Sequence, residues 1–164
     1  MAAFEYEWYT EDEPSTAPLY AARAILPYLL IGNLRGASQA HLLFTSQLGK
    51  SNPNLALQEV TTTSSELRIY PSLPLLNFLG LLLLSVQRGA ADLFRQLRRQ
   101  YDAQLKEANW GEALDQIGEM YFQIKIPSQS NPLFDMMGSL LMGGGGGGQK
   151  GRGGSSGPPL PALD

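Results

Sequence analysis

Apolar residues recur at helical spacing in the first half of the chain and predict two helices. Residues 14–18 combine a capping hydroxyl with a proline suited to a first helical turn, so a helix should run over residues 17–31. Gly32-Asn33 ends this helix, and small or apolar residues at helical spacing predict a second one over residues 34–48. Because the connection is short, we expect the two to form an antiparallel helical hairpin.

Residues 55–70 interrupt this helical pattern. Leu55–Thr61 and Glu66–Tyr70 alternate in polarity and contain β-branched residues, which predicts two strands of a β-hairpin. The connecting residues 62–65 lack the Asn-Gly or Asp-Gly pair of the tightest hairpin turns. A two-stranded ribbon is marginally stable by itself, so a hairpin near 55–70 needs something to pack on.

The second half of the chain is again helical in pattern. Residues 73–88 are apolar on nearly every side, which is typical of a helix buried all round, and Gly89 ends them. Residues 90–108 carry one apolar stripe, and residues 110–124 echo the leucine, glycine and tyrosine spacing of a tetratricopeptide (TPR) first helix. We therefore predict an all-α fold, a helical-repeat (TPR-like α-solenoid) fragment with an inserted β-hairpin.

Composition divides the chain into three predicted parts. Residues 1–126 should form the α-solenoid unit, with the β-hairpin near 55–70. Residues 127–142 include a short Phe/Met/Leu cluster, which we expect to act as an apolar docking segment. Residues 143–164 begin with six glycines and continue as a Gly/Ser/Pro tail, which predicts a disordered end.

Charge and cysteine content exclude several classes of protein. A formal net charge of -3 supplies no positive field for nucleic acid, and the absence of cysteine excludes disulfides and thiolate chemistry. Residues 1–13 are acidic and aromatic, unlike a secretory signal. The apolar run over residues 73–86 is shorter than the ~20 residues that span a bilayer. We predict a cytosolic protein with no stable membrane insertion.

Candidate chemistry is sparse. His41 is the only histidine and has no acid or nucleophile near it in the sequence, and the carboxylates show neither metal-loop spacing nor a paired arrangement. The run Gly143–Gly148 lacks the strand, the Lys-Ser/Thr pair and the helix of a phosphate loop. We expect no catalytic residue, metal or cofactor. Two other hypotheses remain, a membrane-surface-associating helical protein and a small enzyme that uses His41.

Several stretches resemble one known family. They are Tyr9–Pro14, Ala21–Leu29, Gly32–Arg35, Leu67–Phe78, Leu81–Arg88, Asp92–Phe94, Asp115–Gly118 and Leu133–Met142. These stretches resemble the C-terminal half of the Golgi to ER traffic protein 4 family, the fourth subunit of the guided-entry-of-tail-anchored-proteins pathway. The resemblance covers nearly all of the chain before the glycine run.

The resemblance implies a cytosolic α-solenoid adaptor with no catalytic step. With a ubiquitin-like partner subunit, such an adaptor links a tail-receiving co-chaperone to the targeting ATPase for tail-anchored membrane proteins. In that family the C-terminal half holds the N-terminal segment of the ubiquitin-like subunit, and a β-hairpin folds over the bound segment. The helices that present the ATPase surface have no counterpart here, so the resemblance implies no ATPase contact for this chain.

The predicted partner site combines the hairpin with the two helices that follow it. An apolar groove between residues 73–86, residues 90–105 and the hairpin would accept a partner helix. Apolar residues of the two helices would be the anchors, and hairpin residues would form the cover. The predicted anchors are Leu75, Phe78, Leu79, Leu82, Phe94, Leu97 and Tyr101, and the predicted cover is Leu57, Val60, Leu67 and Ile69.

Overall fold

The computed structural model describes residues 1–53, 55, 58–62 and 65–125, and for residues 58–62 and 65–67 it describes the backbone alone. Residues Met1–Ile126 form one compact unit. The predicted docking segment at 127–142 and the predicted tail at 143–164 lie outside the described residues. The account of the structure below therefore concerns the Met1–Ile126 unit.

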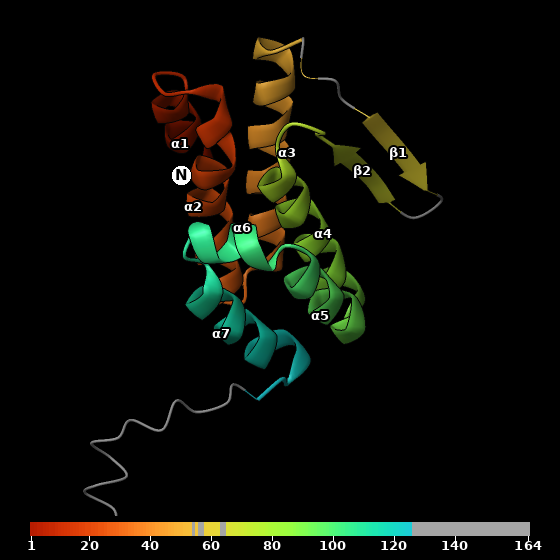
Figure 1. The fold of residues 1–164 in the computed structure, drawn as a ribbon. Helices are drawn as coiled ribbons and strands as arrows, with labels where there is room; N and C mark the ends of the chain where they lie inside the picture. Colours follow the sequence, from red (N-terminus) through yellow and green to blue (C-terminus); the bar gives the residue numbers. More distant parts are fainter. Residues whose placement is uncertain (54, 56–57, 63–64, 126–164) are drawn as a thin grey trace, which may run out of the picture. The chain divides into compact units, whose positions relative to one another are not determined.

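Helices make up most of this unit, and one β-hairpin is inserted between the third and fourth helices (Figure 1). The all-α fold with an inserted hairpin is confirmed. In order, the elements are α1 (Ala2–Tyr9), the 3-10 turn η1 (Pro14–Thr16), α2 (Ala17–Leu30), α3 (Leu34–Ser51), β1 (Gln58–Thr62), β2 (Ser65–Ile69), α4 (Pro74–Arg88), α5 (Ala91–Gln100), α6 (Asp102–Glu107) and α7 (Gly111–Phe122).

The capping hydroxyl predicted within residues 14–18 does not cap α2, because the Thr16 hydroxyl donates to the Glu13 carbonyl at 2.6 Å. Signals at two other helix boundaries do act. The Asn33 side chain caps α3 by accepting a hydrogen bond from the Gly36 backbone N–H at 2.8 Å. Gly89 ends α4 with φ at 60°, a left-handed conformation that glycine adopts without a steric cost. The hairpin strands are antiparallel, with Gln58 opposite Ile69 and Thr62 opposite Ser65.

The core lies where α2, α3 and α4 contact one another, and these three helices stand side by side in Figure 1. The chain then returns through α5 and α6 to α7, which contacts α2. The Tyr121 hydroxyl donates a hydrogen bond to the Leu29 carbonyl at 3.0 Å and fixes this return. The largest fully buried helical side chains come from α2, α3, α4, α5 and α7: Ile25, Leu29, Phe44, Leu48, Leu76, Phe78, Leu79, Leu82, Phe94, Leu114 and Ile117.

The helix α1 was not predicted from the sequence. Glutamates and aromatic residues alternate in its sequence, so no helical apolar stripe is visible there. In the structure the helix nevertheless has a buried side that includes Ala2, Tyr6 and Tyr9. Tyr6 packs edge-on against Phe44 of α3 with ring centroids 5.5 Å apart. Its hydroxyl also donates a hydrogen bond to the Ser51 hydroxyl at 2.7 Å. Contacts with α2 and α3 therefore order a segment whose own pattern is weak.

The prediction of one helix over residues 90–108 was wrong, because the structure breaks it at Tyr101 into α5 and α6. Tyr101 leaves helical geometry at φ -103° and ψ 13°, and its ring packs on Phe78 with centroids 5.4 Å apart. The apolar spacing continues across the break, since Leu97 and Leu105 are both buried. Periodicity alone therefore could not reveal the change of direction.

Candidate partner-binding face

Five of the eleven side chains predicted to contact a partner are buried in the chain's own core. They belong to α4 and α5 and form part of the hydrophobic cluster that joins these helices to α2 and α7. In this structure they pack inside the core and are not available for contact with a partner. They are Phe78, Leu79, Leu82, Phe94 and Leu97.

The remaining predicted residues do not gather in one groove. Leu75, Tyr101 and Ile69 are half-buried, but they lie on different sides of α4. Tyr101 lies on the side that Phe78 faces, whereas Ile69 directly precedes Tyr70, which bonds to Asn77 on another side of α4. The side chains of the other three, Leu57, Val60 and Leu67, lie outside the described residues.

The hairpin is anchored to the helices at its base. The Tyr70 backbone N–H donates to the Asn77 side-chain oxygen at 2.7 Å, and the Asn77 amide donates back to the Tyr70 carbonyl at 2.8 Å. The buried Tyr70 side chain reaches the Thr45 carbonyl of α3 at 3.5 Å. Arg68 of β2 donates to the Ser46 hydroxyl at 3.4 Å. Asn77 and Tyr70 thus fix where the hairpin leaves the helical body.

Beside this base, α3 and α4 present leucines that the predicted site did not include. Leu42 and Leu43 of α3 are 57% and 55% exposed, and Leu81 and Leu84 of α4 are half-buried. Leu42 lies one turn from Ser46, and Leu81 lies one turn from Asn77, so both stripes of leucine lead away from the hairpin base. We call Leu42, Leu43, Leu81 and Leu84 the hairpin face.

The sequence contained a partial signal for this face. Leu42 falls outside the apolar stripe of residues 34–48, and a leucine outside the stripe of an amphipathic helix is a candidate contact residue. Leu43 falls within the apolar spacing of residues 34–48, yet it is 55% exposed in the structure. For Leu81 and Leu84 no local signal existed, because nearly every side of residues 73–88 is apolar.

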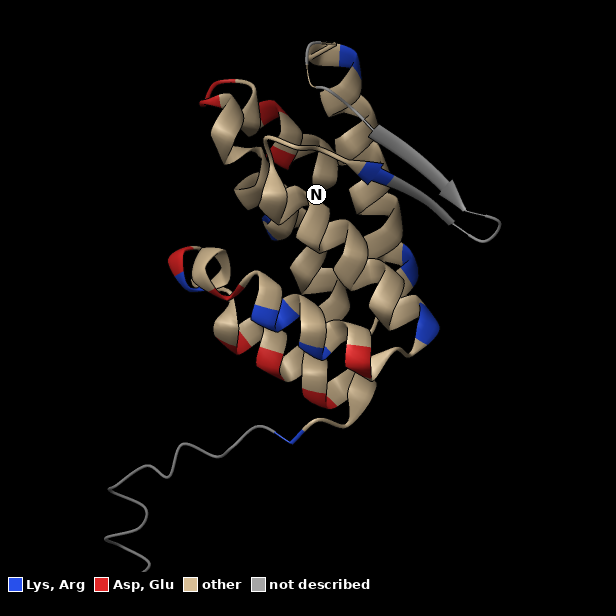
Figure 2. Ribbon diagram, turned by 45° about the vertical axis from the view of Figure 1, so that its right-hand side comes forward, with Lys and Arg blue, Asp and Glu red and all other residues tan. Residues whose placement is uncertain are grey.

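Charge is unevenly distributed around the helices. Figure 2 shows basic positions along α3, at the base of the hairpin and at the end of α4, while α5–α7 carry basic and acidic positions side by side and α1 is acidic. On the α5–α7 side, Arg98 pairs with Asp115 at 2.5 Å and Lys106 pairs with Asp102 at 2.7 Å. Burial, together with the charge of nearby Arg68, lowers the pKa of His41 from 6.5 to about 4, so His41 is neutral at physiological pH.

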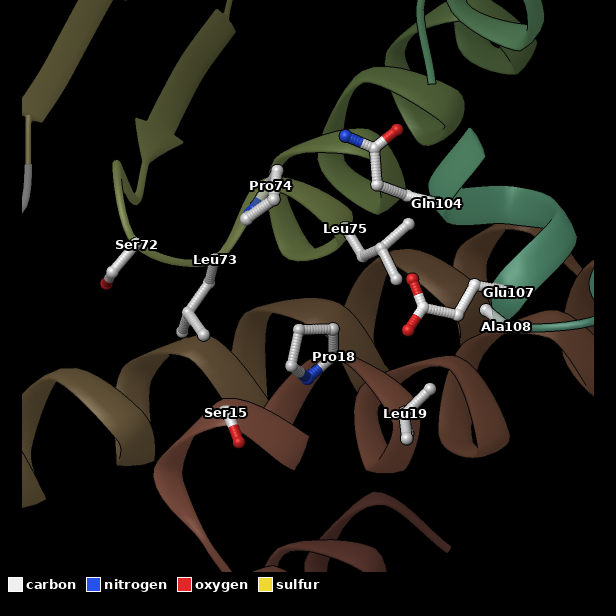
Figure 3. A pocket seen from close by; sticks show the side chains of 10 residues that line it. All are labelled: Ser15, Pro18, Leu19, Ser72, Leu73, Pro74, Leu75, Gln104, Glu107 and Ala108. Carbon is white, nitrogen blue, oxygen red and sulfur yellow. The ribbon is translucent and has the colours of Figure 1, made fainter. Parts of the chain in front are cut away.

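A second surface carries two adjoining hollows of about 410 and 360 Å³, which share Leu19 and Ala108 as lining residues. In Figure 3, Leu19, Leu75 and Glu107 converge on the larger hollow from α2, α4 and α6. Six of its ten lining residues are apolar, and the other four are Ser15, Ser72, Gln104 and Glu107. This surface is separate from the hairpin face and contains none of the hairpin-face leucines.

Nothing among the described residues assembles a metal centre, since no three His, Asp or Glu side chains group there in a way that could hold an ion. His41 is half-buried and lies near Arg68, whose charge opposes protonation of the ring. The helices of the described part are also too short or too polar to cross a bilayer.

Comparison with known proteins agrees with this architecture. A protein from Aspergillus fumigatus called Golgi to ER traffic protein 4 is 60% identical over 144 residues, which cover 87% of this chain and 42% of that protein. The Schizosaccharomyces pombe protein of the same name is 31% identical over 84% of this chain and 45% of its own length. The chain thus spans a little under half the length of these curated relatives.

A solved structure and a family profile complete the comparison. The crystal structure of C. therm. Get4 superposes with a TM-score of 0.75 at 57% identity, covering 94% of this chain and 48% of that one. The profile of the family described as Golgi to ER traffic protein 4 matches residues 1–141, which leaves the glycine-rich end outside the match. The chain belongs to the Golgi to ER traffic protein 4 family.

Proposed function

We propose that this chain is the partner-binding half of a non-catalytic adaptor in the targeting of tail-anchored membrane proteins to the endoplasmic reticulum. It works in the cytosol and binds the N-terminal segment of a ubiquitin-like subunit on the hairpin face. Family membership supports the role in Golgi-to-ER traffic, and relatives carry the name of traffic proteins. The helices of the family that meet the targeting ATPase are not part of this proposal.

One observation carries the proposal: an anchored hairpin stands beside leucines that the chain leaves exposed on α3 and half-buried on α4. Asn77 and Tyr70 hold the base of the hairpin, and a two-stranded ribbon gains stability when it packs on another element. Contiguous apolar surface on a folded protein marks an interaction site. A segment bound between the hairpin and the leucines would cover both.

The binding mode is helix-in-groove recognition, in which an amphipathic helix places its apolar side on exposed leucines. Leu42, Leu81 and Leu84 are the contact residues on α3 and α4. Ile69 and the hairpin residues Leu57, Val60 and Leu67 form the cover. The buried Phe78, Leu79 and Leu82 hold α4 in place and contribute indirectly.

The test is a titration calorimetry measurement with the purified ubiquitin-like subunit of the same organism. In Leu81→Asp/Leu84→Asp we expect the affinity to fall at least ~100-fold, because two carboxylates would be desolvated in an apolar contact. Both leucines are partly exposed, so the variant should keep the helical circular dichroism of the wild type. Leu19→Asp, on the surface with the two hollows, is the matched control and should bind as the wild type does.

The proposal fails if the wild-type chain does not bind the subunit. It also fails if the Leu81→Asp/Leu84→Asp variant, folded by circular dichroism, binds with unchanged affinity.

A further inference from the structure

Side-chain hydrogen bonds close the hairpin face at both of its ends. At the end remote from the hairpin, the Gln87 amide of α4 donates to the Ser38 hydroxyl of α3 at 3.1 Å. At the hairpin end, Arg68 of β2 donates to the Ser46 hydroxyl of α3 at 3.4 Å. We call these two hydrogen bonds the polar bridges, and the leucines of the face lie between them.

On α3, one exposed leucine lies midway between the polar bridges. Leu42 follows Ser38 by four residues and precedes Ser46 by four, so the three residues share one side of the helix. Ser38 and Ser46 are half-buried, whereas Leu42 is 57% exposed. At a rise of about 1.5 Å per residue, the two bridges are about 12 Å apart along α3.

The α4 side of the face has similar limits. Leu84 precedes Gln87 by three residues, so one helical turn separates them. Leu81 follows Asn77 by four residues, and Asn77 is the side chain that holds the hairpin base. The helix rises about 15 Å from Asn77 to Gln87. Both helices therefore offer an apolar surface of two to three turns that ends in polar groups in either direction.

This length limits how many apolar residues a bound helix can use. Apolar residues on one side of a helix recur at i, i+3 or i+4, and i+7, and the first and last of these are about 10 Å apart. The next residue of such a stripe, at i+11, would lie about 16 Å from the first and would meet a polar bridge. An apolar side chain over a bridge withholds water from the amide, hydroxyl and guanidinium groups there, which costs free energy.

We propose that the segment bound on the hairpin face presents three apolar side chains within about eight residues, and that the two polar bridges fix its register. This rests on the proposed function and adds the length and spacing of the partner's apolar stripe. A shift of one turn in either direction would place an apolar side chain over a bridge, so one alignment is favoured over its neighbours. The leucines supply the affinity, and the bridges supply the specificity.

The first test is a scan of the partner. The probe is a synthetic peptide of the N-terminal segment of the ubiquitin-like subunit, in which each apolar residue in turn is replaced by alanine, a change that preserves helix propensity. By titration calorimetry we expect three positions, spaced as i, i+3 or i+4, and i+7, to lose at least about tenfold in affinity, and apolar residues further along to stay within about threefold. A fourth sensitive position at i+11, or sensitive positions that alternate as in a strand, overturns the inference and leaves the proposed function intact.

The second test lengthens the apolar surface. Ser38→Leu/Gln87→Leu replaces the bridge remote from the hairpin with two leucines, and Gln96→Leu/Gln100→Leu adds two leucines to an exposed side of α5 as the matched control. Two further peptides carry one extra leucine each, one turn before the first apolar anchor or one turn after the third. Circular dichroism establishes that both protein variants fold.

On the wild type we expect neither extended peptide to bind more than about threefold tighter than the original peptide. On Ser38→Leu/Gln87→Leu, one of the two should bind at least about tenfold tighter than the original, because one more leucine is buried. The control variant should give the wild-type pattern. Equal gains on wild type and Ser38→Leu/Gln87→Leu, or no gain on that variant, overturns the inference and leaves the proposed function intact. Absence of any binding of the original peptide to the wild type defeats both proposals.

Discussion

His41 is the residue whose environment changes its chemistry most. Burial, assisted by Arg68, lowers its pKa from 6.5 to about 4 in the folded protein. The unfolded chain therefore binds a proton below about pH 6.5 that the folded chain takes up only near pH 4. By linkage, the His41 contribution to stability is complete above pH 6.5 and is lost as the pH falls toward 4.

This gives a prediction for the pH dependence of unfolding. Between pH 6.5 and 4.5 the free energy of unfolding of the wild type should fall more steeply than that of His41→Gln, by at most about 3 kcal/mol over the interval. Urea denaturation at several pH values measures both slopes. Because every carboxylate is present in both proteins, their titration cancels in the comparison. Parallel slopes would show that His41 titrates alike in the folded and unfolded chains.

At the same scale, the sequence predicted that His41 has an ordinary role and not a catalytic one, because no acid or nucleophile stands near it in the chain. The structure places Arg68 near it, a neighbour 27 positions away, since β2 lies over α3. Such a long-range neighbour follows from the path of the hairpin, which local pattern does not encode.

At the scale of elements, the hairpin depends on one side chain of α4. Asn77 both accepts from and donates to the backbone of Tyr70, so Asn77→Ala removes two part-buried hydrogen bonds at the base of the hairpin. We expect a loss of about 1–3 kcal/mol in the free energy of unfolding. Hydrogen exchange of the Tyr70 amide and of the β2 amides should quicken more than exchange in α7.

A control on an exposed helix position separates this effect from general weakening. Gln116→Ala in α7 removes an exposed amide and should leave exchange in β2 unchanged. If Asn77→Ala and Gln116→Ala gave the same exchange rates in β2, the anchoring role of Asn77 would be refuted.

The helices and the hairpin were predictable because the apolar residues of each recur at a regular spacing and because boundary residues mark where an element begins or ends. The start of α3 directly follows Asn33 and the end of α4 directly precedes Gly89, and the alternation around residues 58–69 predicted the strands. The break at Tyr101 was not predictable, because no glycine, proline or change in period marks it. Packing of its ring on Phe78 accompanies the break.

At the scale of the whole molecule, Phe78 joins three parts of the unit. Its ring lies 5.4 Å from that of Tyr101 and 6.3 Å from that of Trp110, at the starts of α6 and α7. Phe78→Ala should therefore cost about 3–5 kcal/mol, because the cavity would be fully enclosed. Leu81→Ala, on the half-exposed side of α4, should cost about 1 kcal/mol or less.

Urea denaturation followed by tryptophan fluorescence measures both losses. The pair tests whether α4 has one supporting side and one contact side, as burial indicates. Similar losses for Phe78→Ala and Leu81→Ala would mean that both sides of α4 are equally buried, and the hairpin face would lose its basis.

The sequence by itself determined the helical class, the inserted hairpin and the likeness to the traffic-protein family, since all three depend on residues close together in the chain. The tertiary structure decided which leucines are core and which are surface. Residues 73–88 are apolar on nearly every side, so nothing in that stretch distinguishes Phe78 and Leu82 from Leu81 and Leu84. Only the placement of α2, α3 and α5 against α4 makes that choice, because burial depends on the neighbours a side chain meets after folding.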